Sequence, residues 1–155
     1  MKFKYLVDHQ NSGRTVYSIL REEFEFSNRL IKKLKRNKLI FCNGTQVNVR
    51  HTLKANDIIE VHMDFKETSE NIKPVKMDLN ILYEDEAIIA LDKPAGVVIT
   101  PIGVHQDNSL ANGLMYYFQN KGIESKIRPV NRLDIDTTGI VVFAKNPYVH
   151  DKLRL

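Results

Sequence analysis

Residues 128–139 hold the densest group of side chains that could do chemistry. The segment reads Arg-Pro-Val-Asn-Arg-Leu-Asp-Ile-Asp-Thr-Thr-Gly, with carboxylates at Asp134 and Asp136 and a guanidinium at Arg132. Carboxylates on one polar loop can bind a cation, attack an electrophilic carbon or transfer a proton. The apolar run 140–144 follows directly and predicts a buried strand. The sequence therefore predicts a chemically active loop at the start of a strand.

The loop also matches the motifs of a calcium site and of a phosphatase, but the residues around it fit neither of them. Asp-x-Asp-x-Thr-Gly begins an EF-hand calcium loop, but the twelfth position from Asp134 is Lys145 instead of a bidentate Glu. Phosphatases of the haloacid-dehalogenase kind place Asp-x-Asp-x-Thr at the end of a buried strand, and residues 129–133 are not an apolar run. The plain structural alternative is a polar loop in which Arg132 forms a salt bridge with Asp134 or Asp136.

Apolar runs and turn residues predict the elements that position this loop. In the second half of the chain we expect strands at 79–83 and 87–91, a tight turn at 93–96, a strand starting at 97–99, a helix from Ser109 to Gly122 and a helix starting at Asn146. These elements favour a mainly antiparallel mixed β-sheet.

The first half predicts two short helices followed by a small antiparallel sheet. A first helix is indicated by apolar residues at helical spacing, namely Val16, Ile19, Leu20 and Phe24. Ser27 is a good N-cap for a second helix. The Asn43-Gly44 turn between apolar runs predicts a hairpin that also includes Val47 and Val49, and residues 57–63 predict another strand.

Positive charge is concentrated in this first half. Residues 1–70 carry 13 Lys and Arg against 9 Asp and Glu, whereas residues 71–155 carry 10 of each. Residues 26–56 hold eight Lys and Arg and no acid. Four cations lie opposite the apolar side of the second helix, namely Arg29, Lys32, Lys33 and Arg36. Like charges repel unless an anion lies between them, so we expect this helix to bind RNA phosphates; a solvated surface is the alternative.

Composition excludes several classes of protein. With 43% hydrophobic and 27% charged residues among 155, the chain is globular instead of disordered or fibrous. No run approaches the ~20 apolar residues of a membrane helix. The single cysteine, Cys42, permits no internal disulfide and cannot alone form a zinc site. We expect a cytoplasmic protein with no membrane partner.

The pattern as a whole resembles RluA-type pseudouridine synthases. Residues 131–139 are similar to their His-Arg-Leu-Asp-x-x-Thr-Ser-Gly signature, with Asn131 for His and Thr138 for Ser, and segments 82–96 and 141–146 also fit. Residues 13–63 resemble the S-four-like RNA-binding domain that precedes the catalytic domain in that family, with Asn56 where glycine is usual.

The resemblance implies an α+β protein. We expect a small α/β RNA-binding domain at residues 1–65, a linker at 66–77 and the N-terminal part of a catalytic domain at 78–155. The family's catalytic domain continues further, so we expect an incomplete sequence, which can lack activity alone.

The resemblance also implies a reaction, the isomerisation of uridine to pseudouridine in rRNA or tRNA. Asp134 matches the aspartate that helps break the N-glycosidic bond, as nucleophile or as base, before the uracil rejoins through C5. Its expected support is Arg132, Asn131, Thr137, Thr138 and Gly139, with Arg132 and loop N–H groups stabilising an ionised carboxylate beside a uridine-sized cavity. No metal or other cofactor is implied, and the base must leave its stack. The alternative is a non-catalytic RNA-binding protein.

Overall fold

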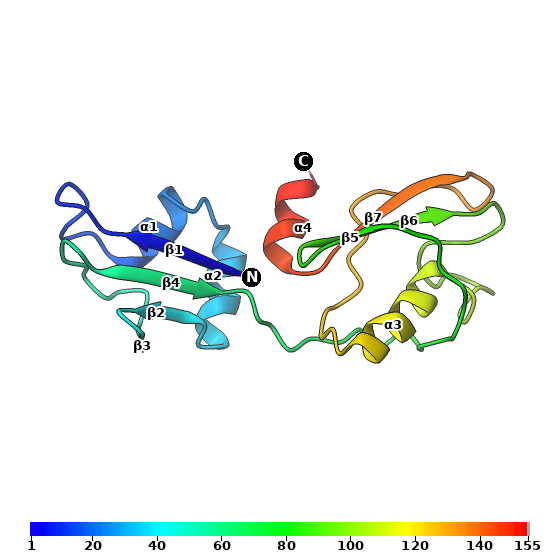
Figure 1. Ribbon diagram of the computed structural model, residues 1–155, viewed down its shortest axis with the longest axis horizontal. Helices are drawn as coiled ribbons and strands as arrows, with labels where there is room; N and C mark the ends of the chain where they lie inside the picture. The colour runs from blue at the N-terminus through cyan, green and yellow to red at the C-terminus, as the bar shows by residue number, and fades with distance from the viewer. Residues whose placement is uncertain (155) are drawn as a thin grey trace. The chain divides into compact units, whose positions relative to one another are not determined.

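The computed structural model describes residues 1–154, so Leu155, the last residue of the predicted catalytic part, lies outside the described residues. The chain divides into two compact units, Met1–Asp64 and Phe65–Leu155. Each unit has its own sheet and its own helices (Figure 1). The predicted α+β class is confirmed. In the described part of the chain, no helix is both long and apolar enough to cross a membrane.

The first unit is a four-stranded antiparallel sheet with two helices on one side (Figure 1). Its elements in chain order are β1 (Lys2–Leu6), α1 (Val16–Glu22), α2 (Asn28–Arg36), β2 (Ile40–Cys42), β3 (Thr45–Gln46) and β4 (Ile58–His62). The strand order is β1-β4-β2-β3. Helix and strand residues share a buried apolar core that includes Ile19, Leu20, Leu30, Leu34, Ile40, Ile59 and Val61.

Local sequence signals explain most boundaries in this unit. The Ser27 side chain accepts a hydrogen bond from Leu30 N at 3.1 Å and so caps α2 as predicted. Asn43 and Gly44 adopt left-handed φ angles of 52° and 82°, which suit the predicted hairpin turn. Asn56 has a φ of 74°, so asparagine takes the left-handed conformation that glycine adopts most easily.

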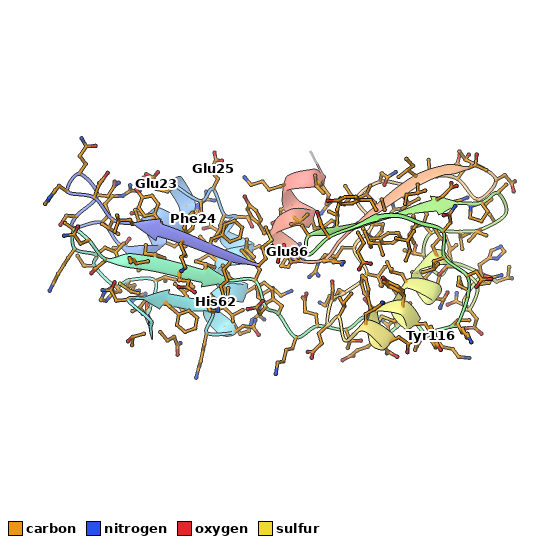
Figure 2. All side chains as sticks on the ribbon, in the orientation of Figure 1. Glu23, Phe24, Glu25, His62, Glu86 and Tyr116 are labelled. Atoms are coloured by element: carbon orange, nitrogen blue, oxygen red, sulfur yellow. The ribbon has the colours of Figure 1, made fainter. Side chains whose placement is uncertain are left out.

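Three features of this unit differ from what the sequence predicted. No strand was predicted at β1, which pairs with the distant β4 along its whole length. Phe24 lies beyond the end of α1 beside β1 (Figure 2), where its ring centroid is 6.0 Å from that of Phe3. Its helical spacing reflects burial against the sheet. The second strand of the hairpin is only Thr45–Gln46, so Val47 and Val49 lie outside it.

The second unit is a three-stranded antiparallel sheet with two helices. Its elements are β5 (Ile81–Glu84), β6 (Ile88–Lys93), α3 (Leu110–Lys121), β7 (Gly139–Ala144) and α4 (Pro147–Leu153), and the strand order is β5-β6-β7. One side of the sheet packs against α3 in a core that includes Ile89, Leu91, Leu114, Phe118, Val141 and Phe143. The predicted cap of α3 is confirmed, because Ser109 and Asn112 form a capping box and Gly122 has a φ of 70°.

One further prediction fails here, and the predicted linker has more tertiary contacts than its polar sequence indicates. Residues 97–99 form no strand, because the carbonyls of Val98 and Ile99 accept hydrogen bonds from the first turn of α3. The predicted linker 66–77 is bound to the second unit. There Glu67 and Arg128 form two parallel hydrogen bonds of 2.8 Å each, with both side chains at least nine-tenths buried. A polar sequence therefore concealed an ordered segment.

Candidate active site and RNA-binding surface

The loop before β7 is guided into place by an extra strand-like segment. On one side β7 pairs with β6, from Ile88↔Ala144 to Lys93↔Gly139. On the other side Pro129 forms a bridge with Phe143, and Val130 N donates to Val142 O at 2.8 Å. Residues 129–130 thus pair with one edge of β7. The chain then reverses direction through residues 131–138 and continues as β7, so Asp134 lies in the reversal.

Asn131 extends this pairing with its side chain. Its Nδ2 donates to Ile140 O and its Oδ1 accepts from Val142 N, both at 2.9 Å. A carboxamide has a donor and an acceptor side by side, so it satisfies both backbone groups of the β7 edge. Asn131 therefore holds the beginning of the loop, and in this geometry its side chain serves the backbone.

Lys93 holds the part of the loop that follows Asp134. It ends β6, is fully buried, and its ammonium donates to Pro94 O at 3.0 Å, Ile135 O at 2.8 Å and Thr137 O at 2.7 Å. These bonds use all three donors of the group. Ile135 O also accepts from Gly96 N at 2.8 Å. The sequence predicted only a tight turn at 93–96, and this clamp was missed because lysine is ordinarily exposed.

Asp134 lies between two anchored neighbours. Leu133 packs against the core of the second unit, and the carbonyl of Ile135 is held by Lys93. Thr137 N donates to Asp134 O at 3.0 Å and closes a turn around the aspartate. The Asp134 side chain itself is exposed. The backbone is thus fixed on both sides while the carboxylate stays open to solvent, which is an arrangement suited to a reactive group.

Gly139 ends the reversal with a backbone angle that favours glycine. Its φ is 147°, and a Cβ at this position would lie 3.2 Å from Leu133 Cδ1. We expect Gly139→Ala to lower the free energy of unfolding by about 1–2 kcal/mol through strain and crowding. Urea unfolding monitored by circular dichroism checks this. Gly113 is no suitable control, because a Cβ there would overlap Met77 Cγ at 2.3 Å, so Ala95→Gly on the exposed turn serves instead.

The structural alternative, a salt bridge between Arg132 and Asp134 or Asp136, is not formed among the described residues. All three side chains are exposed. Exposed ion pairs gain at most about 1 kcal/mol, so nothing forces this contact. The hydroxyls of Thr137 and Thr138 are likewise at the exposed surface of the loop. The expected support of the carboxylate by Arg132 therefore stays a prediction.

Arg132 instead lines a hollow next to Asp134. The hollow measures about 160 Å³ and is bounded by Val98, Ile99, Thr100, Ile102, Pro129, Arg132, Leu133 and Ile135. Leu133 and Ile135, the two neighbours of Asp134, both belong to it. Small-molecule sites measure roughly 300–1,000 Å³, so this hollow does not by itself enclose a nucleoside. The predicted uridine-sized cavity is therefore represented here by a smaller, largely apolar hollow with one cation at its rim.

The predicted cations of α2 lie at the surface of the first unit. Arg29, Lys32 and Arg36 are exposed, and Lys33 is half-buried. The buried side of the helix carries Leu30, Ile31 and Leu34 as expected. Within the described part of the chain, Arg29, Lys32 and Arg36 form no ion pair. Their charges are not neutralised by acids of the protein, so they can attract a polyanion.

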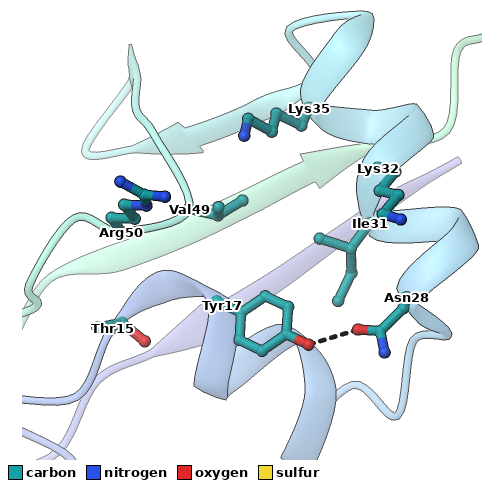
Figure 3. A pocket seen from close by; sticks show the side chains of 8 residues that line it. All are labelled: Thr15, Tyr17, Asn28, Ile31, Lys32, Lys35, Val49 and Arg50. Atoms are coloured by element: carbon teal, nitrogen blue, oxygen red, sulfur yellow. Dashed lines mark hydrogen bonds between the residues drawn. The ribbon is translucent and has the colours of Figure 1, made fainter.

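A basic pocket lies beside this helix, and sequence reasoning missed it. The pocket measures about 580 Å³ and is lined by Thr15, Tyr17, Asn28, Ile31, Lys32, Lys35, Val49 and Arg50 (Figure 3). Only Lys32 was among the predicted RNA-binding residues. Lys35 and Arg50 belong to the acid-free stretch 26–56, which was the available signal. The pocket combines three cations with an exposed aromatic ring, the combination that binds nucleotides of single-stranded RNA.

A partly buried hydrogen-bond network joins β5 to α3 and to Lys145, which directly follows β7. Glu84 accepts from Lys145 Nζ at 2.6 Å and from the Tyr117 hydroxyl at 2.5 Å. Burial raises the pKa of Glu84, but the bonds from Lys145 and Tyr117 outweigh it and the pKa is lowered. The hydrogen bond to Glu84, together with burial, raises the pKa of Tyr117 from 10.0 to about 12. The network therefore favours a neutral tyrosine and an ionised glutamate.

This network predicts a loss of stability in alkali. Above pH 10 the unfolded chain releases the Tyr117 proton, whereas the folded chain keeps it until about pH 12, so the stabilisation is full below pH 10 and disappears between these values. We expect the melting temperatures of wild type and Tyr117→Phe to converge over this range. Tyr116→Phe, on the same helix, is the control and should follow wild type. A constant difference between wild type and Tyr117→Phe would contradict the prediction.

Comparison with protein families decides what kind of protein carries these sites. Residues 87–155 match the model for "RNA pseudouridylate synthase", and residues 3–59 match the "RluD ribosomal pseudouridine synthase N-terminal domain". The chain belongs to the RNA pseudouridine synthase family. Each matched segment lies within one of the two units of the fold.

Individual synthases extend this similarity over most of the chain. "Uncharacterized RNA pseudouridine synthase YhcT" of Bacillus subtilis is 32% identical over 145 residues, which cover 94% of this chain and 48% of the relative. "Ribosomal large subunit pseudouridine synthase D" of Xanthomonas campestris is 31% identical over 141 residues, or 90% of this chain and 42% of the relative. An Aquifex aeolicus synthase is 35% identical over 133 residues. The chain thus spans less than half the length of these curated pseudouridine synthases.

Proposed function

We propose that this chain forms the RNA-binding domain and part of the catalytic domain of an RNA pseudouridine synthase. The observation that carries the proposal is Asp134, an exposed carboxylate whose backbone is fixed by Leu133 on one side and by the Lys93 clamp on the other. It lies in the position of the family's aspartate in the Arg-Leu-Asp motif. The fixed loop presents the carboxylate to an extruded nucleotide.

In this proposal Asp134 acts on the ribose of the target uridine. An ionised carboxylate either attacks C1′ or removes the 2′ proton, and in both cases the N1–C1′ bond breaks and the detached uracil rejoins through C5. As C5 bonds to C1′, any Asp134–C1′ bond breaks or the removed 2′ proton is returned. The C5 proton is then released to solvent and N1 takes up a proton, so uridine and pseudouridine have the same composition. Arg132, at the rim of the hollow, is placed to bind a phosphate or a carbonyl of the nucleotide.

We further propose ribosomal RNA of the large subunit as the substrate. Relatives named ribosomal large subunit pseudouridine synthase D support this choice over tRNA. The chain binds this RNA through Arg29, Lys32, Lys33 and Arg36 on α2, and the basic pocket adds Lys35 and Arg50. In this proposal the partner is cytoplasmic RNA, so the protein is also proposed to be cytoplasmic.

Charge removal on α2 tests the RNA-binding part. We expect Lys32→Ala with Lys33→Ala to weaken RNA binding and to reduce the slope of log K against log salt by about 1–2, because each phosphate contact releases a condensed counterion. The control is Lys73→Ala with Lys76→Ala, which removes the same charge from an exposed segment of the second unit. Fluorescence anisotropy at several salt concentrations measures both. An unchanged slope in the α2 variant would leave α2 as a solvated surface.

The alternative function is RNA binding without catalysis, and RNA affinity cannot separate the two. We therefore define a fusion protein in which residues 1–155 are joined to the part of the Xanthomonas campestris synthase that follows its matched region. The assay is formation of new pseudouridine in bulk RNA, by the chain alone and by the fusion protein. If the folded fusion protein is inactive while the intact Xanthomonas synthase is active, the non-catalytic alternative holds.

A further inference from the structure

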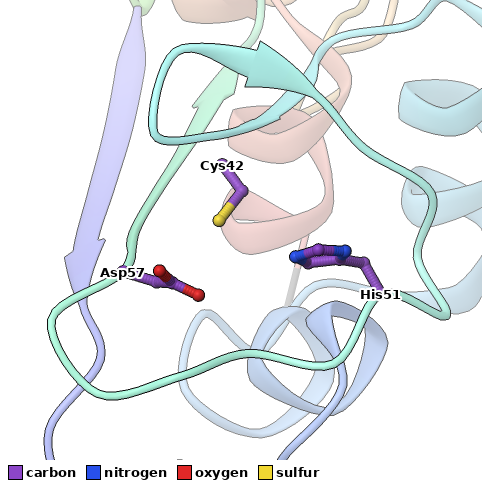
Figure 4. Close-up of side chains that lie close together, drawn as sticks. All are labelled: Cys42, His51 and Asp57. Carbon is purple, nitrogen blue, oxygen red and sulfur yellow. The ribbon is translucent and has the colours of Figure 1, made fainter.

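Three metal-binding side chains of different types meet in the first unit, apart from Asp134 and from the cations of α2. Cys42 ends β2, His51 lies in the loop after β3, and Asp57 directly precedes β4 (Figure 4). The sulfur, a ring nitrogen and a carboxylate oxygen all lie within 4.8 Å of one another. Within residues 1–154 this is the only group of three or more such ligands. The proposed reaction uses none of them.

The carboxylate of this cluster is already oriented by neighbouring groups. Asp57 Oδ1 accepts from Asn43 Nδ2 and Oδ2 accepts from Lys54 N, both at 2.9 Å. Each oxygen keeps a second lone pair, so these bonds leave it able to bind a cation. The Cys42 sulfur lies within 4.8 Å of a ligand oxygen of this carboxylate. Outer hydrogen bonds of this kind fix the ligands in metal sites.

Burial and charge across the cluster suit a cation that enters from solvent. Cys42 is only 6% exposed, whereas His51 is exposed and its backbone is held by His51 N→Asn48 O and Val16 N→His51 O. The cluster thus places a buried sulfur next to a carboxylate, with an exposed imidazole on the side from which a cation can enter.

We propose that Cys42, His51 and Asp57 bind a divalent cation of the zinc class, with water as the fourth ligand. Thiolate, imidazole and carboxylate together are ligands that zinc accepts, whereas magnesium and calcium require oxygen ligands. Adjacent ligand atoms in a tetrahedral zinc site lie about 3.3–3.8 Å apart, so a rotation of the exposed His51 side chain completes the set. The cation would tie the end of β2 to loop 48–57, which carries Arg50 of the basic pocket.

The test is titration of the reduced chain with Co²⁺ and then with Zn²⁺. We expect one Co²⁺ per chain with a thiolate charge-transfer band, displacement by Zn²⁺, and release of a proton near neutral pH. His51→Ala, which keeps every backbone contact, should weaken Co²⁺ binding by more than about tenfold. His9→Ala, another exposed histidine of this unit, should bind as wild type, and Cys42→Ala should lose the band.

Three outcomes would overturn the metal site. They are the absence of a thiolate band at millimolar Co²⁺ in folded wild type, equal Co²⁺ affinity of wild type and His51→Ala, and equal loss in His9→Ala. Zinc should also raise the melting temperature of wild type but not of His51→Ala. None of these measurements involves RNA or catalysis, so the metal site and the proposed function can fail separately.

Discussion

Asp134→Asn is expected to reduce pseudouridine formation by the fusion protein by more than about 10³-fold, with RNA affinity nearly unchanged. Asparagine has the shape of aspartate but cannot ionise, so it neither attacks C1′ nor accepts the 2′ proton. The fold should not change, because the Asp134 carboxylate is exposed and the turn around it is held through the backbone. Nuclease digestion of the RNA followed by chromatography measures the product.

Asp136→Asn is the matched control for this experiment. Asp136 is also exposed, lies on the same loop and loses the same charge, but it is two residues away from the family's aspartate position. We expect the Asp136 variant to retain most of the turnover. Equal losses in both variants would point to loop charge as the cause, and retained turnover in Asp134→Asn would move the chemistry to another residue.

Lys93→Met is expected to lower the free energy of unfolding by about 1–3 kcal/mol. Methionine fills a similar volume but donates no hydrogen bond, so the carbonyls of Pro94, Ile135 and Thr137 lose the ammonium that they share. A buried acceptor without a partner costs about 1–3 kcal/mol. Because Ile135 and Thr137 both lie within three residues after Asp134, the same change should also loosen the loop and reduce turnover of the fusion protein.

Lys76→Met is the control for the clamp. Lys76 is exposed, and exposed substitutions ordinarily change stability by no more than about 0.5 kcal/mol. Urea unfolding of both variants gives the comparison directly. If Lys93→Met were as stable as Lys76→Met, the three hydrogen bonds would not hold the loop, and the positioning of Asp134 would need another explanation.

Sequence predicted the features that depend on neighbouring residues. Ser27 and Ser109 cap their helices because an N-cap bonds to an amide only three residues away. The Asn43-Gly44 turn formed because both residues tolerate positive φ. The class of the fold, α+β, followed from such local signals together with the resemblance. The family itself was recognisable because the Arg-Leu-Asp motif and its surroundings are continuous in the sequence.

Features that depend on distant contacts were missed. Burial of Lys93 depends on hydrogen bonds to Ile135 and Thr137, which lie 42 and 44 residues later in the sequence. The polar sequence of residues 66–77 is typical of a linker, and it does not reveal the ion pair between Glu67 and the distant Arg128. The basic pocket joins α1, α2 and the loop at Arg50, and no periodicity shows which lysine faces it. Conversely, Arg132 is close in sequence to Asp134 and Asp136, but these exposed side chains form no salt bridge with it.

Release of tritium from C5 of uridine tests the central claim most directly. The claim is that this chain, completed in the fusion protein, isomerises uridine with Asp134 as the reacting carboxylate. Joining uracil to ribose through C5 displaces the C5 hydrogen, so one tritium per pseudouridine should enter the solvent. We expect release from tritiated large-subunit rRNA with the fusion protein and none above background with Asp134→Asn. No release by the folded fusion protein, under conditions where the intact Xanthomonas synthase releases tritium, would contradict the claim.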